Sequence, residues 1–225
     1  MKKILVVETN IGTYGDRKEA TGLWLGENTE FVREVTAAGY SVDYASPKGG
    51  YVPIDPRSIQ YASKEDLQMY NDANFREKAL SHTLKPTDVN SSDYQAIYFT
   101  GGHGVMWDFP HNNEFHQISL DIYNNGGFIT SVCHGISALL YLKDRKGDYI
   151  IQNKKITGFT NTEEILSGKR NRVPILNEKV ARSHGSIFQK KRAFSPYAVQ
   201  DGNLITGQNP YSPKEVATLL IKNLK

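Results

Sequence analysis

Short apolar runs alternate with amphipathic stretches along the chain, a pattern typical of βαβ units built around a parallel sheet. Ile4–Val7 is an uninterrupted apolar run, as expected for a strand buried on both faces. A polar loop, Thr9–Ala20, leads into a predicted helix over residues 21–38, and Gly39 is suited to end it. Ser41–Ala45 is the second predicted strand.

The same alternation continues through the second half of the chain. Strands are predicted at Gln95–Thr100, Phe128–Val132 and Lys155–Gly158, and helices at Asn113–Asn124, His134 to about Leu142, and from Ser212 onward. Asp201-Gly202 is a typical hairpin turn, so the flanking runs 197–200 and 204–206 are predicted to pair. The pattern therefore predicts one α/β domain spanning residues 1–225, with a mostly parallel sheet.

The stretch between Pro47 and Asp93 contains no predicted strand. It begins with SPKGGYVPIDPRS, which is rich in proline and glycine, and short helical patterns follow near Lys64–Met69 and Asn74–Ser81. Connections of this length usually carry function. We therefore expect residues 47–93 to be an inserted lid or interface element.

Composition narrows the functional classes. Hydrophobic residues make up 39% of the 225 positions and charged residues 23%, as is ordinary for a globular protein. A net charge of +3 does not favour nucleic-acid binding, and no apolar run approaches the ~18 residues of a membrane span. The four-residue run before Glu8 is too short for a secretory signal. We therefore expect a cytoplasmic protein without nucleic-acid or membrane partners.

Cys133 is the single cysteine, which excludes an intrachain disulfide and a Cys-rich zinc site. It follows a predicted buried strand directly, in FITSVCHGISALL, and a helical pattern follows it. This strand–turn–helix places Cys133 at the carboxyl edge of the sheet, where α/β proteins build active sites. A sharp turn there exposes a nucleophile and aims the next N–H at an oxyanion. The alternative is a buried cysteine that only packs, as most lone cysteines do.

A second glycine-rich turn, GGHG, follows the third predicted strand. Gly101 and Gly102 let a backbone N–H approach a ligand closely, as an oxyanion donor must, although paired glycines also occur in ordinary turns. His103 is either a pocket residue or a loop histidine bonded to the backbone. Trp24 and Trp107 are candidates to line a pocket around the cysteine, although most aromatic residues belong to the core.

Six blocks of the sequence, in this order, resemble the ThiJ/PfpI superfamily and more narrowly its heat-shock chaperone/glyoxalase III branch. The blocks are ATGLWLGE, ASPKGGYVPIDP, GGHGVMWD, SVCHG, KKITGFTNTEE and DGNLITGQNP. They span nearly the whole chain. The resemblance implies a flavodoxin-like three-layer α/β sandwich with a nucleophile elbow, related to class I glutamine amidotransferase domains.

The resemblance also implies roles for individual residues. Cys133 matches the elbow nucleophile, and His134 matches its histidine partner. Glu27 matches the acid that sits against the sulfur, and Glu164 matches the acid that orients the histidine. Gly102 and the amide of His134 match the donors of the oxyanion hole.

Each of the two acids has a competitor. Gly26 stands where this branch often has the first of two consecutive acids, so Glu30, one helical turn later, competes with Glu27. Glu163 is adjacent to Glu164 and competes with it in the same way. A carboxyl beside a thiolate should keep its proton and donate a hydrogen bond to sulfur.

The function that the resemblance implies is a glutathione-independent glyoxalase of the glyoxalase III type, a lyase that converts methylglyoxal to D-lactate through a hemithioacetal on Cys133. The same chemistry would serve a protein deglycase. The rival class is a stress-response chaperone or redox sensor whose cysteine is oxidised without turnover. An amidase or peptidase is a weaker alternative, because no motif marks a peptide-binding cleft. A small 2-oxoaldehyde substrate, no cofactor, no metal and a homodimer are also implied.

Overall fold

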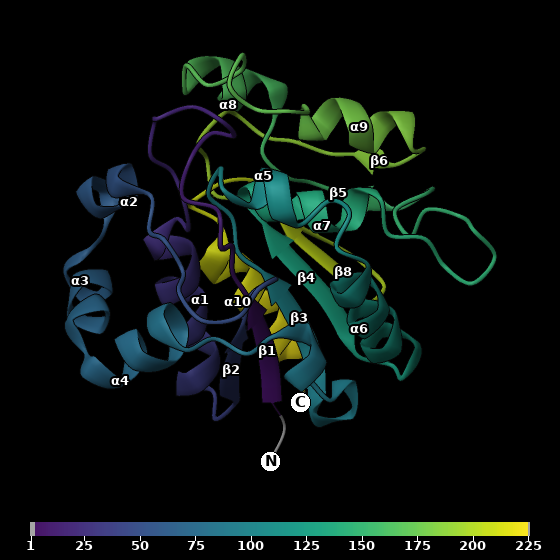
Figure 1. Ribbon diagram of the computed structural model, residues 1–225. Helices are drawn as coiled ribbons and strands as arrows, with labels where there is room; N and C mark the ends of the chain where they lie inside the picture. The colour runs from purple at the N-terminus through teal and green to yellow at the C-terminus, as the bar shows by residue number, and fades with distance from the viewer. Residues whose placement is uncertain (1–2, 225) are drawn as a thin grey trace.

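The computed structural model describes residues 3–224 and centres on a six-stranded sheet in the order β2-β1-β3-β4-β8-β7 (Figure 1). The strands are β1 Lys3–Val7, β2 Ser41–Ala45, β3 Tyr94–Phe99, β4 Phe128–Val132, β7 Ala198–Asp201 and β8 Leu204–Gly207. Only β7 runs antiparallel to its neighbour, through the predicted hairpin. Strand β1 pairs with β2 from Lys3 opposite Ser41 to Val7 opposite Ala45. The predicted mostly parallel α/β sheet is confirmed.

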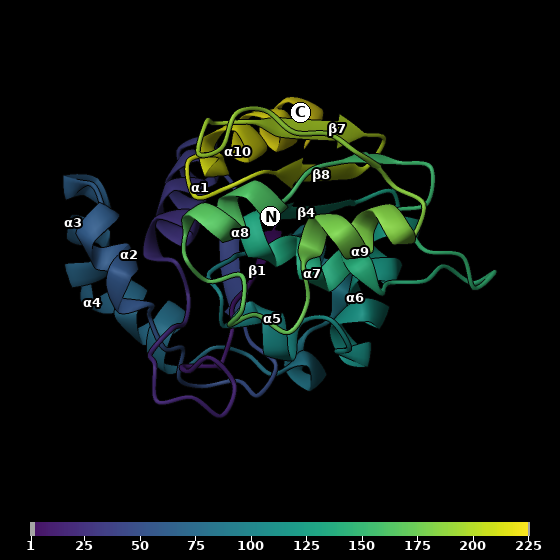
Figure 2. The same cartoon turned by 90° about the horizontal axis from the view of Figure 1, so that it is seen from above.

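Helices cover both faces of the sheet, giving three layers (Figure 2). Strand β1 shows why, because its side chains alternate between two hydrophobic cores. Ile4 and Val6 join the core beneath helices α1 (Leu25–Ala37) and α10 (Pro213–Leu224). Leu5 and Val7 join the opposite core, beneath α6 (Asn113–Asn124). The apolar run Ile4–Val7 is therefore buried on both faces of the sheet, as its sequence predicted.

Helix α1 begins at Leu25, four residues later than the predicted start. The preceding residues run extended instead, because the amide of Leu23 donates to the carbonyl of Pro53 at 2.8 Å. Gly22 has a φ of 151°, and a Cβ there would lie 2.2 Å from the Pro53 oxygen. This close backbone contact between distant segments prevents the helix from starting earlier.

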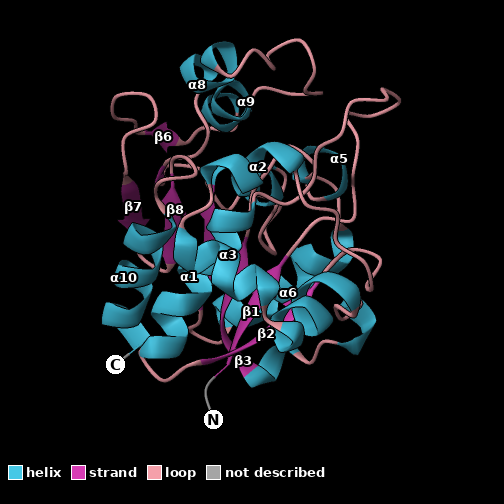
Figure 3. Ribbon diagram, turned by 90° about the vertical axis from the view of Figure 1, so that its left-hand side faces the viewer, coloured by secondary structure: helices cyan, strands magenta, loops and turns pink. Residues whose placement is uncertain are grey.

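Residues 56–81 pack beside α1 and β2, at the left of Figure 1 and facing the viewer in Figure 3, whereas residues 86–93 pack against α6. The segment holds α2 Pro56–Tyr61, α3 Lys64–Asn71, α4 Ala73–Phe75, a π-helical turn η1 Arg76–Ser81, and the 3₁₀ turns η2 Pro86–Asp88 and η3 Ser91–Asp93. Two of these helical stretches match the predicted ones. Helix α2 was missed, although Asp55 caps it and Pro56 occupies its first position, which is a recognised start signal.

The remaining short elements gather above the carboxyl ends of the parallel strands (Figure 1). They are α5 Val105–Asp108, η4 Cys133–Ile136, α7 Ser137–Leu140, α8 Asn161–Leu166 and α9 Asn177–Ser183, with a two-stranded sheet of β5 Lys155–Ile156 and β6 Ile187–Phe188. Two predicted elements are shorter than expected. The strand 155–158 keeps only two residues, and the helix after His134 begins as a 3₁₀ turn. Within residues 3–224, no helix is long and apolar enough to cross a membrane.

Candidate active site

Cys133 occupies the sharp turn between β4 and η4 and is only 2% exposed. Its φ of 55° is left-handed, which costs a non-glycine residue energy and is typical of strained functional turns. The turn passes so close to β3 that a Cβ on Gly135 would lie 2.3 Å from the Phe99 carbonyl oxygen. The sulfur is therefore held at the carboxyl edge of the sheet, in the geometry of a nucleophile elbow.

The Cys133 sulfur contacts His134, and His134 in turn contacts Glu164. The distance from Cys133 Sγ to His134 Nδ1 is 3.3 Å, and His134 Nε2 lies 2.9 Å from Glu164 Oε2. The amide of Phe159 donates to the Cys133 carbonyl at 3.1 Å, which ties the start of α8 to the elbow. Residues from two separate segments thus form a continuous path of polar atoms from thiol to carboxylate.

Glu163 points into a different network from Glu164. Its carboxylate caps α8 and is otherwise enclosed by donors from the last third of the chain. Those donors are the Thr160 amide and hydroxyl, the Phe194 amide, and the side-chain amides of Gln208 and Asn209, all at 2.8–2.9 Å. Of the two adjacent acids, Glu164 faces His134, and Glu163 joins α8 to the loop at Phe194 and to the two residues that follow β8.

Glu27 is fully buried in the first turn of α1, against the Cys133 thiol and the Gly101 amide. A Cβ on Gly101 would lie 2.3 Å from Glu27 Oε2, so the glycine makes room for the carboxyl. Neither carboxyl oxygen has a hydrogen bond of ordinary geometry within residues 3–224. Glu30, by contrast, lines a separate small cavity on the other side of Trp24. Glu27 is thus the acid that faces the sulfur.

Burial raises the pKa of Glu27 well above its usual range, and contacts with the thiol and the Gly101 amide offset this only in part. Burial also raises the pKa of the Cys133 thiol, a charged Glu27 raises it further, and the amide of His134 lowers it. Two negative charges cannot share so dry a site. Glu27 therefore holds a proton whenever the sulfur is a thiolate. Burial of the sulfur itself opposes the thiolate.

His103 has a larger part in the site than the sequence suggested. Its Nε2 lies 2.9 Å from Glu164 Oε1, and its ring centroid lies 4.1 Å from that of His134. Burial, followed by the charge of His134, lowers the pKa of His103 to about 4. Burial alone would raise the pKa of Glu164, but the charge of His134 and hydrogen bonds from both histidines hold it well below its usual range. Glu164 is therefore ionised, and its two oxygens lie against the imidazoles of His103 and His134.

A cavity of about 420 Å³ opens above the sulfur. It is lined by Trp24, Arg57, Gln60, Tyr61, Gly102, His103, Cys133, His134, Phe159, Leu166, Ser167, Phe194, Pro210 and Tyr211. Of the predicted pocket residues, Gly101 lies beneath the lining against Glu27, and Trp107 packs edge-on against Tyr14. Arg57 and Phe159 also line the cavity, and no motif in the sequence predicted either of them. The helix-start signal at Asp55-Pro56 is the one feature that could have drawn attention to Arg57.

The two residues predicted to donate to an oxyanion, Gly102 and His134, lie beside the sulfur or the cavity above it. Gly102, with a φ of 96°, lines the cavity, and the amide of His134 lies at the sulfur. A Cβ on Gly102 would lie 2.1 Å from the Gly22 carbonyl oxygen, so this backbone approach requires glycine. Both predicted donors thus border the space in which a bound carbonyl would react.

His103, His134 and Glu164 also bring possible metal-ligand atoms within 4.8 Å of one another. Two imidazoles and a carboxylate suit Zn²⁺. However, Arg57 Nη2 lies 3.2 Å from His103 Nδ1, and a guanidinium can only donate. The proton of His103 therefore resides on Nε2, the nitrogen that a metal would need. The cluster of His103, His134 and Glu164 therefore fits hydrogen bonding better than metal ligation.

A buried cysteine on an elbow at the edge of a parallel sheet, with a histidine and two acids around it, defines an α/β protein built for cysteine chemistry. Residues 22–223 match the DJ-1/PfpI family, and the chain belongs to that family. The family predicted from the sequence blocks is thereby confirmed.

Several relatives match along the whole chain. The Saccharomyces cerevisiae protein named glutathione-independent glyoxalase HSP31 is 31% identical over 238 residues, covering 100% of this chain and 98% of the relative. The structure of Rapid Encystment Protein 24 kDa from Francisella tularensis superposes with a TM-score of 0.96 at 36% identity, over 100% of both chains. Glyoxalase III from Candida albicans superposes with a TM-score of 0.89 at 28% identity, over 98% of this chain and 96% of that one.

Proposed function

We propose that this protein is a glutathione-independent glyoxalase of the glyoxalase III type, acting on methylglyoxal or a similar small 2-oxoaldehyde. The proposal rests on the surroundings of one buried thiol beneath a cavity. His134 and Glu27 contact the Cys133 thiol, and Glu164 contacts His134 from the other side of its ring. Full-length relatives that are named glyoxalases support it.

In the proposed reaction, the Cys133 sulfur attacks the aldehyde carbon and its proton passes to His134 Nδ1, which lies 3.3 Å away. The new oxyanion faces the amides of Gly102 and His134 and takes up a proton, which gives a hemithioacetal. Moving the hydrogen from C1 to C2 then yields a lactoyl thioester, with His134 and Glu27 placed to carry protons. Water cleaves the thioester, releases D-lactate and restores the thiol, so no external oxidant or reductant is consumed.

The test is D-lactate formation from methylglyoxal without glutathione, measured for the wild type, Cys133→Ala and Glu27→Gln. We expect turnover by the wild type, loss to background in Cys133→Ala, and a decrease of roughly 10²–10⁴-fold in Glu27→Gln. Wild-type turnover no higher than that of Cys133→Ala would refute the proposal. If mass spectrometry then showed ready addition of two oxygens at Cys133, the redox-sensor alternative would take its place.

We further propose a homodimer located in the cytoplasm, with residues 47–93 forming a wall or lid of the active site. Helix α2 supports the last point, because Arg57, Gln60 and Tyr61 line the cavity. The unpaired thiol supports a reducing compartment, and the family resemblance supports the dimer. Light scattering should give twice the chain mass of 25.3 kDa for a dimer, and a monomeric mass would contradict that part.

A further inference from the structure

Two imidazoles, rather than one, hold the Glu164 carboxylate. His134 Nε2 lies 2.9 Å from Oε2, and His103 Nε2 lies 2.9 Å from Oε1. An ionised carboxylate only accepts hydrogen bonds, so both Nε2 atoms must donate. In the neutral ring, a His134 that donates from Nε2 has its Nδ1 lone pair toward the Cys133 sulfur, which is the form required of a base.

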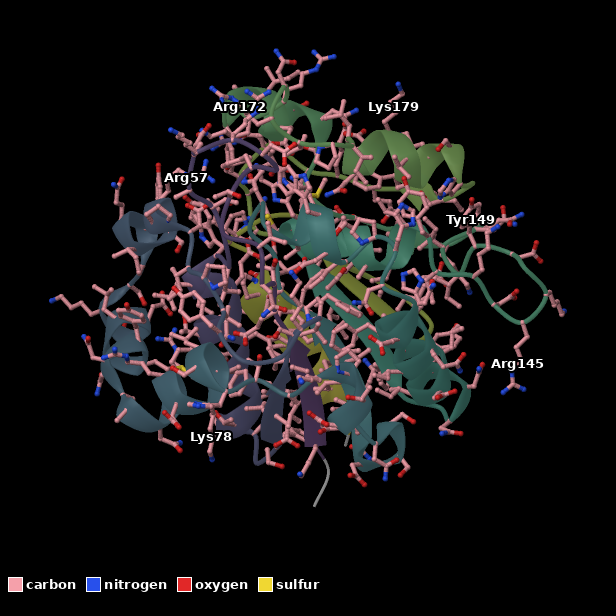
Figure 4. All side chains as sticks on the ribbon, in the orientation of Figure 1. Arg57, Lys78, Arg145, Tyr149, Arg172 and Lys179 are labelled. Atoms are coloured by element: carbon pink, nitrogen blue, oxygen red, sulfur yellow. The ribbon has the colours of Figure 1, made fainter. Side chains whose placement is uncertain are left out.

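His103 is in turn held from its other side by Arg57, which lies in the first turn of α2 (Figure 4). Arg57 is anchored on the fully buried Asp55, with Nε 3.0 Å from Oδ1 and Nη2 2.6 Å from Oδ2. Nη2 also lies within hydrogen-bond distance of the Tyr14 hydroxyl and of His103 Nδ1. Because Arg57 cannot accept, Nδ1 carries the lone pair, and His103 is fixed as the neutral tautomer protonated at Nε2.

We propose that His103 is a positioning residue of the active site, which, held by Arg57, fixes Glu164 in the orientation and charge that His134 requires. The inference rests on the proposed glyoxalase function. A carboxylate bound by two donors cannot rotate away from either, and charge-assisted hydrogen bonds of this kind are among the strongest in proteins. The chain from Asp55 through Arg57 and His103 to Glu164 thus sets the tautomer of His134 from a distance.

The tautomer can be read directly by ¹⁵N NMR of histidine-labelled protein at pH 7, since the chain has only six histidines to assign. We expect His103 to be protonated at Nε2 and unprotonated at Nδ1, and His134 to carry a proton on Nε2. A His103 that is cationic, or protonated at Nδ1, would overturn the proposal. This measurement does not depend on turnover, so it stands even if methylglyoxal is not the substrate.

The kinetic test compares two substitutions of the same residue. His103→Phe keeps a ring beside His134 but removes both hydrogen bonds, and we expect kcat/KM to fall roughly 10- to 100-fold. In a plot of kcat/KM against pH, the fall in activity at low pH (the acid limb) should also move toward neutral pH. The reason is that Glu164, with one hydrogen-bond donor fewer, takes up a proton more readily. His103→Gln can accept from Arg57 and donate to Glu164, so it should recover most of the loss and return the acid limb toward its wild-type position.

His111→Phe is the matched control, since this exposed histidine also packs on an aromatic ring, that of Tyr141, with centroids 4.3 Å apart. It should leave both kcat/KM and the acid limb unchanged. If His103→Phe lowers activity without moving the limb, or if His103→Gln recovers nothing, the residue only packs and the proposal fails. If the wild type itself does not turn over methylglyoxal, the glyoxalase function fails, and the tautomer measurement decides the positioning role.

Discussion

Replacing the Glu27 carboxyl with an amide should stabilise the protein at neutral pH while it slows the reaction. Glu27 is fully buried, and burial raises its pKa well above the usual range. The folded state therefore keeps a proton that the unfolded chain releases as the pH rises through about 4.5. Since the folded state binds more protons, wild-type stability falls with rising pH from there up to the folded pKa. Glutamine has nearly the same shape as glutamate and does not ionise, so Glu27→Gln removes this pH-dependent loss of stability.

The size of the effect follows from proton linkage. Each pH unit between the unfolded and the folded pKa costs the wild type about 1.4 kcal/mol of unfolding free energy relative to the variant. Between pH 5 and pH 7 the difference can therefore grow by about 2.7 kcal/mol. In a chain of this length, that corresponds to roughly 5–10 °C in Tm.

Urea unfolding at pH 5, 6, 7 and 8 measures this difference. Glu114→Gln, on the exposed side of α6, is the matched control and should show a small difference from the wild type that does not change with pH. The reasoning is refuted if the gap between Glu27→Gln and the wild type stays constant across these pH values. It is also refuted if the gap widens as the pH falls, because the buried carboxyl would then be stabilised as a charge.

Three further substitutions separate site geometry from structural support. Gly101→Ala would place a methyl group 2.3 Å from Glu27 Oε2, so D-lactate formation should fall more than about 100-fold. Gly126→Ala, whose φ of 84° also strains an alanine but whose Cβ would meet no atom of residues 3–224 within 4 Å beyond its chain neighbours, should retain activity. Glu163→Gln turns an acceptor enclosed by buried donors into a donor, and urea unfolding should show a loss of about 2–4 kcal/mol. Tyr98→Phe removes a buried hydroxyl that donates to the Glu27 carbonyl at 2.7 Å, and unfolding should register a loss of about 1–2 kcal/mol.

The sequence predicted helices and strands correctly where the pattern that marks them lies in contiguous residues. Ile4–Val7 and Phe128–Val132 are apolar at most positions, and a strand inside a doubly covered sheet is what buries such runs. The hairpin was predicted from Asp201-Gly202, and Gly202 does adopt a positive φ of 57°. Helix α1 was extended four residues too far, because the contact between Gly22 and Pro53 that prevents an earlier start joins segments 31 residues apart in the sequence.

By itself, the sequence determined the strand–turn–helix around Cys133 and the family to which the chain belongs, because both are written in contiguous residues. It left the partners of the sulfur open. Glu27 and Glu30 share one helix, and Glu163 and Glu164 are neighbours, so only the packing of α1 and α8 on the sheet decides which carboxyl faces inward. The bond from His103 to Glu164 spans 61 positions, and the tautomer that Arg57 imposes depends on a third segment. Tertiary structure alone decided these contacts, because they form only when the loops above the sheet meet at its carboxyl edge.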